Sequence, residues 1–284
     1  MSNDLSAAGA ASPSMLQFSL KDKVILVTGA TGVLGEAFVR AIAEAGGTVV
    51  LLGRNAAVAK ERTDLLVSQG YKAGYRVCDV LNQEALETVA EKVLSEYGAI
   101  HGLVNGAGGN KPGAVIMPDQ DLFSLDVPAL QEVFNLNLFG TVLPSMVFGK
   151  HIAAAGGGSI VNISSIAAQQ VLTRVLGYSL AKGAVDNFTR WMSVELALRK
   201  YNNTRVNAIA PGFFLAEQNR KLLLNDDGTL TPRGQAVISN TPYGRFGNPN
   251  ELTGALVWLL SDASAFVTGE IIRVDGGFGA WSGV

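Results

Sequence analysis

Apolar and polar positions follow two rhythms that alternate along this chain. Continuous apolar runs rich in β-branched residues, such as VILVT at 24–28 and TVVLLG at 48–53, are typical of strands covered on both faces. Stretches with apolar residues at helical spacing follow them: EAFVRAIAEAG first, then segments from about Asn55 to Gln69 and from about Asn82 to Tyr97. Further strands are predicted in YRVCD, IHGLVN, SIVNIS, RVNAIA and IIRVDGG.

Strands separated by helices of this length indicate a parallel sheet with right-handed crossovers. The pattern therefore predicts an α/β protein of the doubly wound, Rossmann type, with a mostly parallel seven-stranded sheet and helices on both faces. The 284 residues are 48% hydrophobic and show no internal repeat or domain boundary, which suits one large core. We expect residues 1–18 to form a flexible tail and residues 19–284 a single domain.

Composition and charge exclude several classes of protein. A net charge of −2 gives no basic footprint for nucleic acid or an anionic membrane. No run approaches the roughly 18 apolar residues of a membrane span, and the first residues lack the basic and apolar regions of a secretory signal. The single cysteine, Cys78, precludes an internal disulfide, and with only two histidines no zinc site is expected. We expect a cytoplasmic protein without a metal.

A glycine turn, TGATGVLG, stands between the first strand and the first helix. In this position Gly29 permits a tight turn, Gly32 lets the backbone approach a pyrophosphate, and Gly35 lets the helix pack on the sheet. Glycines alone are a weak signal in a chain with 33 of them. The strand before and the helix after make the turn a strong indication of dinucleotide binding.

Two residues are candidates for contacts with the adenosine half of the dinucleotide. Arg54 follows the second strand, where an arginine accommodates the 2′-phosphate of NADP(H) and an acidic residue binds the ribose of NAD(H). NADP(H) is therefore slightly favoured over NAD(H), although Arg54 stacking on adenine or facing solvent is nearly as good an account. Asp79 is placed to accept a hydrogen bond from an adenine amino group; its alternative role is to cap the helix that begins around Asn82.

The segment Ser164 to Lys182, SSIAAQQVLTRVLGYSLAK, carries the candidate chemistry. On a helix, Tyr178 and Lys182 share one face, so the ammonium can lie beside the phenol and favour its ionised form. Ser165, near the end of a predicted strand, could hydrogen-bond a carbonyl or alcohol. Together these groups suit hydride transfer coupled to proton transfer. Without the glycine turn, the usual interpretation of a tyrosine and a lysine at this spacing would be a half-buried ring beside a solvated amine.

Several motifs in this order resemble the short-chain dehydrogenase/reductase family: TGATGVLG, Asp79, NGAG at 105–108, Asn137, Ser165, YSLAK, Pro211-Gly212 and VDGG. The resemblance implies a catalytic tetrad in which Tyr178 exchanges the proton and Ser165 polarises the carbonyl. It also implies that Lys182 lowers the tyrosine pKa and holds the nicotinamide ribose, while Asn137 fixes a water that links Lys182 to solvent.

The same resemblance implies a set of cofactor contacts around the strand ends. They are Gly29, Thr31, Gly32, Leu34, Gly35, Arg54, Asp79, Val80, Asn105, Ala107, Gly108, Tyr178, Lys182, Pro211 and Gly212. Three positions depart from the family pattern. Val33 replaces a glycine, NGAG replaces NNAG, and Ala216 stands where many relatives have a threonine, which puts a hydroxyl contact to the cofactor in doubt.

The long segment at about 213–248 is expected to cover the substrate as a lid. Cations and amides near the mouth suit a sugar acid better than a steroid or fatty acyl chain. The candidate substrate contacts are Asn110, Lys111, Ser165, Arg174, Tyr178 and Gln218, with Gln169, Asn219 and Arg220 as further polar candidates. Alternatively Lys111 is a loop charge, Arg174 serves a subunit contact, and Arg220 and Lys221 are a solvated helix face.

Finer motifs, NGAGGN with KPG, LNLFGT and PGFF before EQNRKLLL, are similar to the subgroup of D-mannonate oxidoreductases, or fructuronate reductases. That subgroup implies exchange between D-mannonate and D-fructuronate with a nicotinamide cofactor. Activities like gluconate 5-dehydrogenase or 3-oxoacyl carrier-protein reductase share the tetrad, and a catalytically silent dinucleotide-binding scaffold is the alternative of another class. The family resemblance also implies a homo-oligomer, a dimer or tetramer.

Overall fold

The computed structural model describes residues 12–215 and 217–283 and holds one seven-stranded sheet in the order β3-β2-β1-β4-β5-β6-β7. Every neighbouring pair is parallel. The doubly wound fold predicted from the sequence is confirmed. The strands are β1 Val24–Thr28, β2 Thr48–Gly53, β3 Ala73–Val77, β4 Gly102–Asn105, β5 Gly158–Ile163, β6 Thr204–Pro211 and β7 Ile271–Val274.

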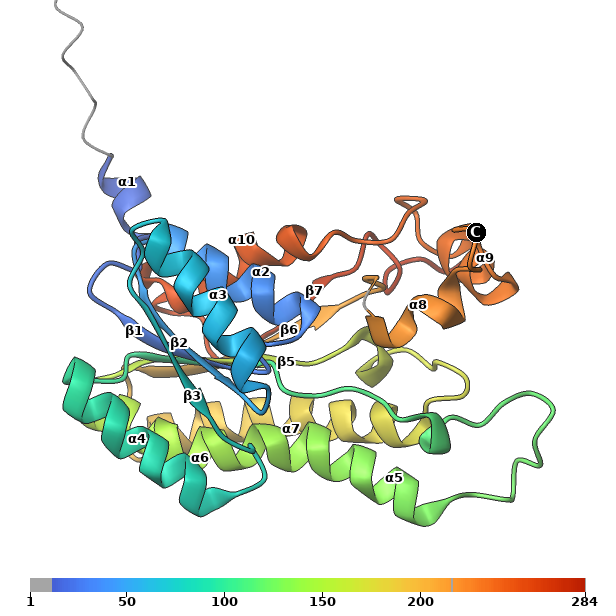
Figure 1. The fold of residues 1–284 in the computed structure, drawn as a ribbon, viewed down its shortest axis with the longest axis horizontal. Coiled ribbons are helices and arrows are strands. Elements are labelled where there is room, and N and C mark those ends of the chain that lie inside the picture. Colours follow the sequence, from blue (N-terminus) through green and yellow to red (C-terminus); the bar gives the residue numbers. More distant parts are fainter. Residues whose placement is uncertain (1–11, 216, 284) are drawn as a thin grey trace, which may run out of the picture.

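Helices cover both faces of this sheet, as Figure 1 shows. One layer holds α2 Val33–Glu44, α3 Ala56–Ser68 and α10 Thr253–Leu260. The other layer holds α4 Gln83–Tyr97, α5 Val127–Phe134, α6 Gly140–Ala154 and α7 Leu176–Leu198. Three short helices complete this set: α1 Pro13–Leu16, α8 Glu217–Leu223 and α9 Pro232–Ser239.

The continuous apolar runs arise because the side chains of a strand such as β1 pack into a hydrophobic core on each face of the sheet. Ile25 and Val27 of β1 enter the core under α2 and α10, whereas Val24 and Leu26 enter the core under α4 and α6. Successive side chains of a strand point to opposite faces, so a sheet covered on both sides needs apolar residues at every position. This is why VILVT shows no alternation.

The helices expected from about Asn55 to Gln69 and from about Asn82 to Tyr97 are confirmed, whereas the end expected for the third strand is wrong. Asn55 accepts a hydrogen bond from Val58 N at 3.2 Å and Asn82 from Ala85 N at 3.0 Å, so they cap α3 and α4. Strand β3 was expected to extend through YRVCD but ends at Val77. Its one neighbour, β2, ends at Gly53, the partner of Val77, so residues 78 and 79 lie beyond the ladder.

The predicted lid, about 213–248, contains α8 and α9 and lies beyond the carboxyl ends of the strands (Figure 1). It is anchored where Gly247 N donates to Phe213 O at 2.9 Å. Ala216 lies outside the described residues, as do residues 1–11 of the expected tail; residues 12–18 include the short helix α1. Among the helices of the described ranges, none combines the length and the hydropathy that a membrane span requires.

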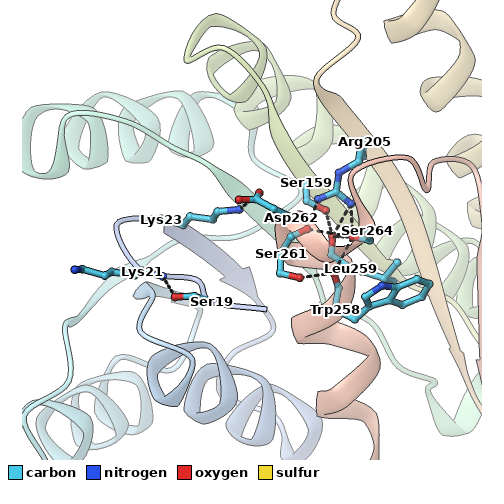
Figure 2. Close-up of polar contacts among 10 residues, drawn as sticks. All are labelled: Ser19, Lys21, Lys23, Ser159, Arg205, Trp258, Leu259, Ser261, Asp262 and Ser264. Atoms are coloured by element: carbon cyan, nitrogen blue, oxygen red, sulfur yellow. Dashed lines mark hydrogen bonds and ion pairs between the residues drawn. The ribbon is translucent and has the colours of Figure 1, made fainter. Parts of the chain in front are cut away.

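The opposite edge of the sheet is held by a buried arginine (Figure 2). Arg205 of β6 donates to Leu259 O at 2.8 Å, to Ser261 O at 3.0 Å and to Ser264 Oγ at 2.7 Å. These acceptors include carbonyls at the end of α10, which a cation stabilises. The contacts fix α10 on the sheet at the end remote from the glycine turn.

Candidate active site

The turn after β1 is packed directly against the turn after β4. Thr28 Oγ1 accepts hydrogen bonds from Gly106 N at 3.1 Å and Ala107 N at 3.2 Å. Gly29 has φ +66°, and a Cβ atom there would lie 2.5 Å from Gly106 O. A Cβ at Gly35 would lie 2.3 Å from Gly29 O. Both positions therefore require glycine, for the tight turn and the close helix packing predicted from the sequence.

Helix α2 begins at this turn with an N-terminus that suits an anion. Gly32 is its N-cap, is exposed, and forms no side-chain cap, so the first-turn N–H groups have no side-chain acceptor there. Such an N-terminus after a parallel strand binds the pyrophosphate of dinucleotides. Thr31 and Leu34, also expected at the cofactor, flank Gly32 and are half-buried. The residues of this turn fit a dinucleotide.

Sequence reasoning missed Arg62 of α3, which braces the same turn. Its Nη1 donates to Ala30 O at 2.6 Å and Gly32 O at 2.8 Å, and its Nη2 to Glu36 at 2.8 Å. The guanidinium thus bonds the carbonyls on both sides of Thr31. No motif marks this arginine, because the contact depends on how α3 packs beside α2.

The side chains expected near adenosine lie at the ends of β2 and β3. Arg54 is exposed directly after β2. Asp79 accepts a hydrogen bond from Leu81 N at 2.9 Å. The alternative role of Asp79 as a helix cap is wrong, because Asn82 caps α4. Val80 is buried beneath Gly140 of α6.

Asn105 was expected to line the cofactor, but its side chain turns into the protein. It is 1% exposed and donates to Ser145 Oγ and Asn162 Oδ1, both at 2.8 Å. Ser145 in turn donates to Thr141 O at 2.7 Å, and Thr141 to Asn137 O at 3.0 Å. The asparagine therefore begins a buried hydrogen-bond chain that leads to Asn137, and the backbone of 106–108 is left at the sheet edge.

The end of β5 is tied to helix α7 by three consecutive residues. Ile163 O accepts a hydrogen bond from Lys182 Nζ at 2.7 Å, Ser164 donates to the carboxylate of Asp186, and the Ser165 hydroxyl is near enough to Tyr178 to affect its pKa. Ser165 Oγ also accepts a hydrogen bond from Ala167 N at 3.1 Å. The structure thus brings Ser165, Tyr178 and Lys182 together. Their spacing along α7 explains it, since residues four apart share a face.

Burial is the main influence on the pKa of Tyr178 in this structure. Burial raises the pKa of Tyr178, and the neighbouring Ser165 hydroxyl opposes that rise. Lys182 Nζ lies 5.6 Å from the centre of the phenol ring and donates to a backbone carbonyl instead. Burial lowers the pKa of Lys182 to about 8, while the Asp186 carboxylate acts to raise it.

Asn137 lies in a π-helical turn, Asn135–Phe139, between α5 and α6. Its Nδ2 donates to Gly109 O at 2.7 Å and Val133 O at 2.8 Å, and its Oδ1 accepts from Gly109 N at 3.1 Å. The side chain therefore holds the loop after NGAG. π-turns are frequent at functional sites, and no local sequence signal marks this one.

The candidate substrate residues are not all gathered at one place. Lys111 forms an ion pair with Glu132, and Asn110 Oδ1 accepts a hydrogen bond from Lys111 N at 3.0 Å.

The remaining polar candidates are also separate from one another. Gln169 donates to Asp186 at 3.4 Å, and Asn219 donates to Phe214 O at 2.8 Å. Gln218 belongs to α8, but its side chain lies outside what the structure describes. Arg220 and Lys221 are exposed on α8.

Arg174 differs from the other candidate cations. Its backbone φ is +77°, which is strained for a residue other than glycine. Ile116 N donates a hydrogen bond to its carbonyl oxygen at 3.0 Å. Thr173 precedes Arg174, and Arg233 of α9 donates to its carbonyl and hydroxyl oxygens, both at 3.3 Å. Burial lowers the pKa of Arg233, and the charge of Arg174 adds to this. In the described part of the chain neither guanidinium forms an ion pair.

The remaining cofactor candidates border β6 and β7. Pro211 ends β6, and Gly212 N donates to Val274 O at 3.0 Å. A Cβ at Gly212 would lie 2.7 Å from Asp275 Cα, so this turn and VDGG are in close contact. Among the described residues, no group of three or more His, Cys, Asp or Glu could hold a metal ion.

A parallel doubly wound sheet, a glycine turn before an uncapped helix, and a serine, tyrosine and lysine at the neighbouring strand end define a dinucleotide-dependent oxidoreductase. Residues 29–279 match the family model described as enoyl-(acyl carrier protein) reductase. The chain belongs to the short-chain dehydrogenase/reductase family and acts on alcohol and ketone groups with NAD or NADP.

Three relatives illustrate the range of this family around the chain. An oxidoreductase of Bacillus subtilis (strain 168) named UxuB, of uncharacterised activity, is 42% identical over 282 residues, 95% of this chain and 99% of that protein. A structure from Haemophilus influenza with bound NAD, provisionally assigned as a D-mannonate oxidoreductase, has a TM-score of 0.88 at 38% identity and covers 95% of this chain and 99% of its own. A gluconate 5-dehydrogenase from Burkholderia cenocepacia J2315, in complex with NADP and tartrate, has a TM-score of 0.85 at 29% identity, with coverages of 94% and 99%.

Proposed function

We propose that this enzyme interconverts a secondary alcohol and a ketone on an open-chain sugar acid, with D-mannonate and D-fructuronate as the leading pair. The observation that carries the sugar-acid part is the pair of guanidinium groups, Arg174 and Arg233. Two like charges beside one loop, without an ion pair in the described chain, are costly unless an anion joins them. A carboxylate accepts two hydrogen bonds from one guanidinium, which makes it the natural anion.

The place of Arg174 relates this anion to the chemistry. It precedes Tyr178 by one helical turn's length of chain, and Arg233 reaches the same loop from the lid helix α9. A carboxylate bound there keeps the rest of a short sugar chain near the phenol. Relatives support this class, since their names include D-mannonate oxidoreductase and gluconate 5-dehydrogenase.

The proposed mechanism assigns one task to each residue of the tetrad. In ketone reduction Ser165 donates a hydrogen bond to the carbonyl oxygen, and Tyr178 gives its proton to that oxygen as the alcohol forms. The cationic Lys182 stabilises the phenolate that is left and holds the ribose, and Asn137 orders the water that returns a proton. The bound dinucleotide supplies the hydride, and alcohol oxidation reverses each transfer.

We also propose the cofactor contacts that the family resemblance implies. The turn 29–35 takes the pyrophosphate, Asp79 and Val80 border the adenine, and residues 107–108 with Pro211 and Gly212 border the ribose and nicotinamide. The exposed Arg54 favours NADP(H) slightly, because no acidic side chain follows β2 to bind a ribose 2′-hydroxyl.

Substrate screening with arginine variants tests the proposal. Purified enzyme is assayed with NADH and NADPH on fructuronate, 5-ketogluconate and an acetoacetyl thioester. We expect turnover of a sugar acid and, in Arg174→Ala and Arg233→Ala, a roughly 10- to 100-fold higher KM for it, since a charged hydrogen bond contributes about 1.5–3 kcal/mol. An uncharged ketone should show little change in KM.

Lys221→Ala serves as the control, because this lysine is exposed on α8 and forms no ion pair in the described chain. Equal effects of the arginine variants on charged and uncharged ketones would dismiss the carboxylate site. Turnover of 5-ketogluconate alone would favour a gluconate 5-dehydrogenase, and turnover of the thioester alone a 3-oxoacyl reductase. Dinucleotide binding without turnover of any ketone would favour a silent scaffold.

A further inference from the structure

Asp186 is a buried carboxylate that the proposed tetrad does not include. It is 4% exposed and lies one turn beyond Lys182 on α7. Its Oδ1 accepts a hydrogen bond from the Ser164 hydroxyl and its Oδ2 accepts one from Gln169 Nε2 at 3.4 Å. A buried carboxylate lowers the free energy of unfolding unless it has hydrogen-bond donors of this kind or balances a nearby positive charge.

The geometry of α7 places Asp186 in series with two tetrad residues. Tyr178, Lys182 and Asp186 are four residues apart and therefore share one face on three successive turns. Each contacts a different one of three consecutive residues at the end of β5: Ser165, Ile163 and Ser164 respectively. The contact of Asp186 thus fixes the register between β5 and α7 on which the other two contacts depend.

Charge balance gives the second reason. Lys182 is 4% exposed, and its one hydrogen-bond acceptor in the described chain is the neutral carbonyl of Ile163. A buried ammonium loses its proton readily unless a negative group lies close. Asp186, one turn away, is that group.

Other charged groups near this face of α7 are few. Burial raises the pKa of Asp186, and the hydrogen bonds from Ser164 and Gln169 and the charges of Arg190 and Lys182 oppose that rise. Tyr178 lies on the other side of Lys182. The strand end at 163–165, the π-turn and the loop with Gln169 contribute neutral groups. Strand β6 carries Arg205 at its far end, bound to the end of α10, and α5 carries Glu132, paired with Lys111.

We propose that Asp186 is a positioning residue for the family reaction: it keeps Lys182 protonated and directed at the strand end, and so sets the upper pH limit of activity. This role of Asp186 affects the reaction of any ketone or alcohol substrate and is independent of the sugar-acid assignment.

The sign of the pH effect follows from the lysine. Ketone reduction needs Tyr178 and Lys182 both protonated, and the pKa of Lys182 is about 8 while burial raises that of Tyr178, so lysine deprotonation ends activity first. Removing the negative charge of Asp186 lowers the lysine pKa further. The alkaline limb of the reduction profile then moves to lower pH.

Asp186→Asn tests this with little change of shape, because the amide still accepts from Ser164. We expect the alkaline limb of kcat/KM to move down by about one pH unit. Activity should then be about fivefold lower than in the wild type at pH 8 and nearly equal at pH 6. A variant that only loosened the packing would lose activity equally at both pH values. A limb at the wild-type pH overturns the proposal.

Two variants separate charge from hydrogen bonding. Ser164→Ala removes the hydroxyl and keeps the carboxylate, so its alkaline limb should stay at the wild-type pH even if the rate falls. Asp64→Asn, on the exposed surface of α3, controls for the loss of one negative charge and should leave the profile unchanged.

A measurement on the wild type covers the case in which Asp186→Asn does not fold. With carboxyl-labelled aspartate, ¹³C NMR should show Asp186 ionised throughout pH 6–9, identified by loss of its signal in Asp186→Glu. A carboxyl that is protonated at pH 7 cannot hold the charge on Lys182 and would overturn the proposal.

Discussion

Gly108 is the backbone position at which the polar ends of two tetrad side chains converge. A Cβ atom there would lie 2.6 Å from Asn137 Oδ1 and 3.3 Å from Lys182 Nζ. The first distance is shorter than real Cβ contacts, and the second leaves the ammonium little room. The last glycine of NGAG is therefore required by the side chains opposite it, whatever cofactor contact its backbone makes.

Gly108→Ala is expected to damage the site more than the fold. The methyl group must displace the Asn137 amide, whose three hydrogen bonds hold the loop at Gly109 and the turn at Val133. We expect a fall in kcat of tenfold or more and a loss of about 1–3 kcal/mol in unfolding free energy, measured by steady-state kinetics and urea denaturation.

Gly254→Ala is the matched control. Gly254 is exposed in α10, and a Cβ atom there meets nothing within 4 Å. Alanine should raise stability by roughly 0.5–1 kcal/mol through helix propensity and leave kcat unchanged. Wild-type kinetics in Gly108→Ala would show that Asn137 can move without harm and would remove it from the proposed mechanism.

Sequence reasoning found residues whose spacing along the chain carries the information. Tyr178 and Lys182 lie four apart, and so do Lys182 and Asp186, so the same rule could have indicated Asp186. Asn105 was expected at the cofactor because its motif suggested it, but the polar groups of α6 and β5 attract its amide inward. Whether a side chain at a strand end turns in or out depends on the neighbouring elements, which the motif does not contain.

At the scale of elements, the glycine turn depends on a helix that does not belong to it. The guanidinium of Arg62 on α3 reaches α2 and donates to Ala30 O, Gly32 O and Glu36, and the Arg62 side chain is 17% exposed. Carbonyls that are bonded in this way hold the peptide N–H groups of the turn toward the opposite side, where a pyrophosphate is expected.

Arg62→Met should weaken cofactor binding and spare the substrate site. Loss of the three charged hydrogen bonds lets the turn relax, so we expect the KM for the dinucleotide to rise about tenfold or more, with little change in kcat at saturating cofactor. Initial-rate kinetics with each substrate varied in turn check this. Arg40→Met, which removes an exposed pair with Glu44 at 3.8 Å on α2, should change neither KM.

The elements themselves were predictable to different degrees. Apolar periodicity located α3 and α4 closely, because this signal is local. The π-turn at Asn135–Phe139 was not foreseen, since NLNLF continues the helical pattern of its neighbours. Hydrogen bonds from Asn137 to the loop at Gly109 support this turn, and they form only when α6 packs beside β4.

At the scale of the whole molecule, helix α7 divides its two faces between separate tasks. The face toward β5 carries Tyr178, Lys182 and Asp186. The opposite face carries an apolar stripe at helical spacing whose side chains are each about half exposed or more: Leu180, Trp191, Val194 and Leu198. A stripe of this size on the surface is typical of a protein interface, and the family resemblance implies a homo-oligomer.

We expect this stripe to pair with its copy in a second chain across a two-fold axis, since an isologous contact buries the same residues on both sides. The double variant Trp191→Glu/Leu198→Glu should be monomeric in multi-angle light scattering at concentrations where the wild type is a dimer or tetramer, because four carboxylates would face one another. Leu65→Glu, a change at a 49% exposed leucine on α3, should leave the mass unchanged. If the double variant keeps the wild-type mass, the stripe does not form the interface. Lys182 and Asp186 lie on the opposite face of the same helix. A monomeric variant should therefore keep its activity if the contacts with residues 163–165 are enough to hold α7 against β5. It should lose activity if the partner chain is needed to hold the helix there.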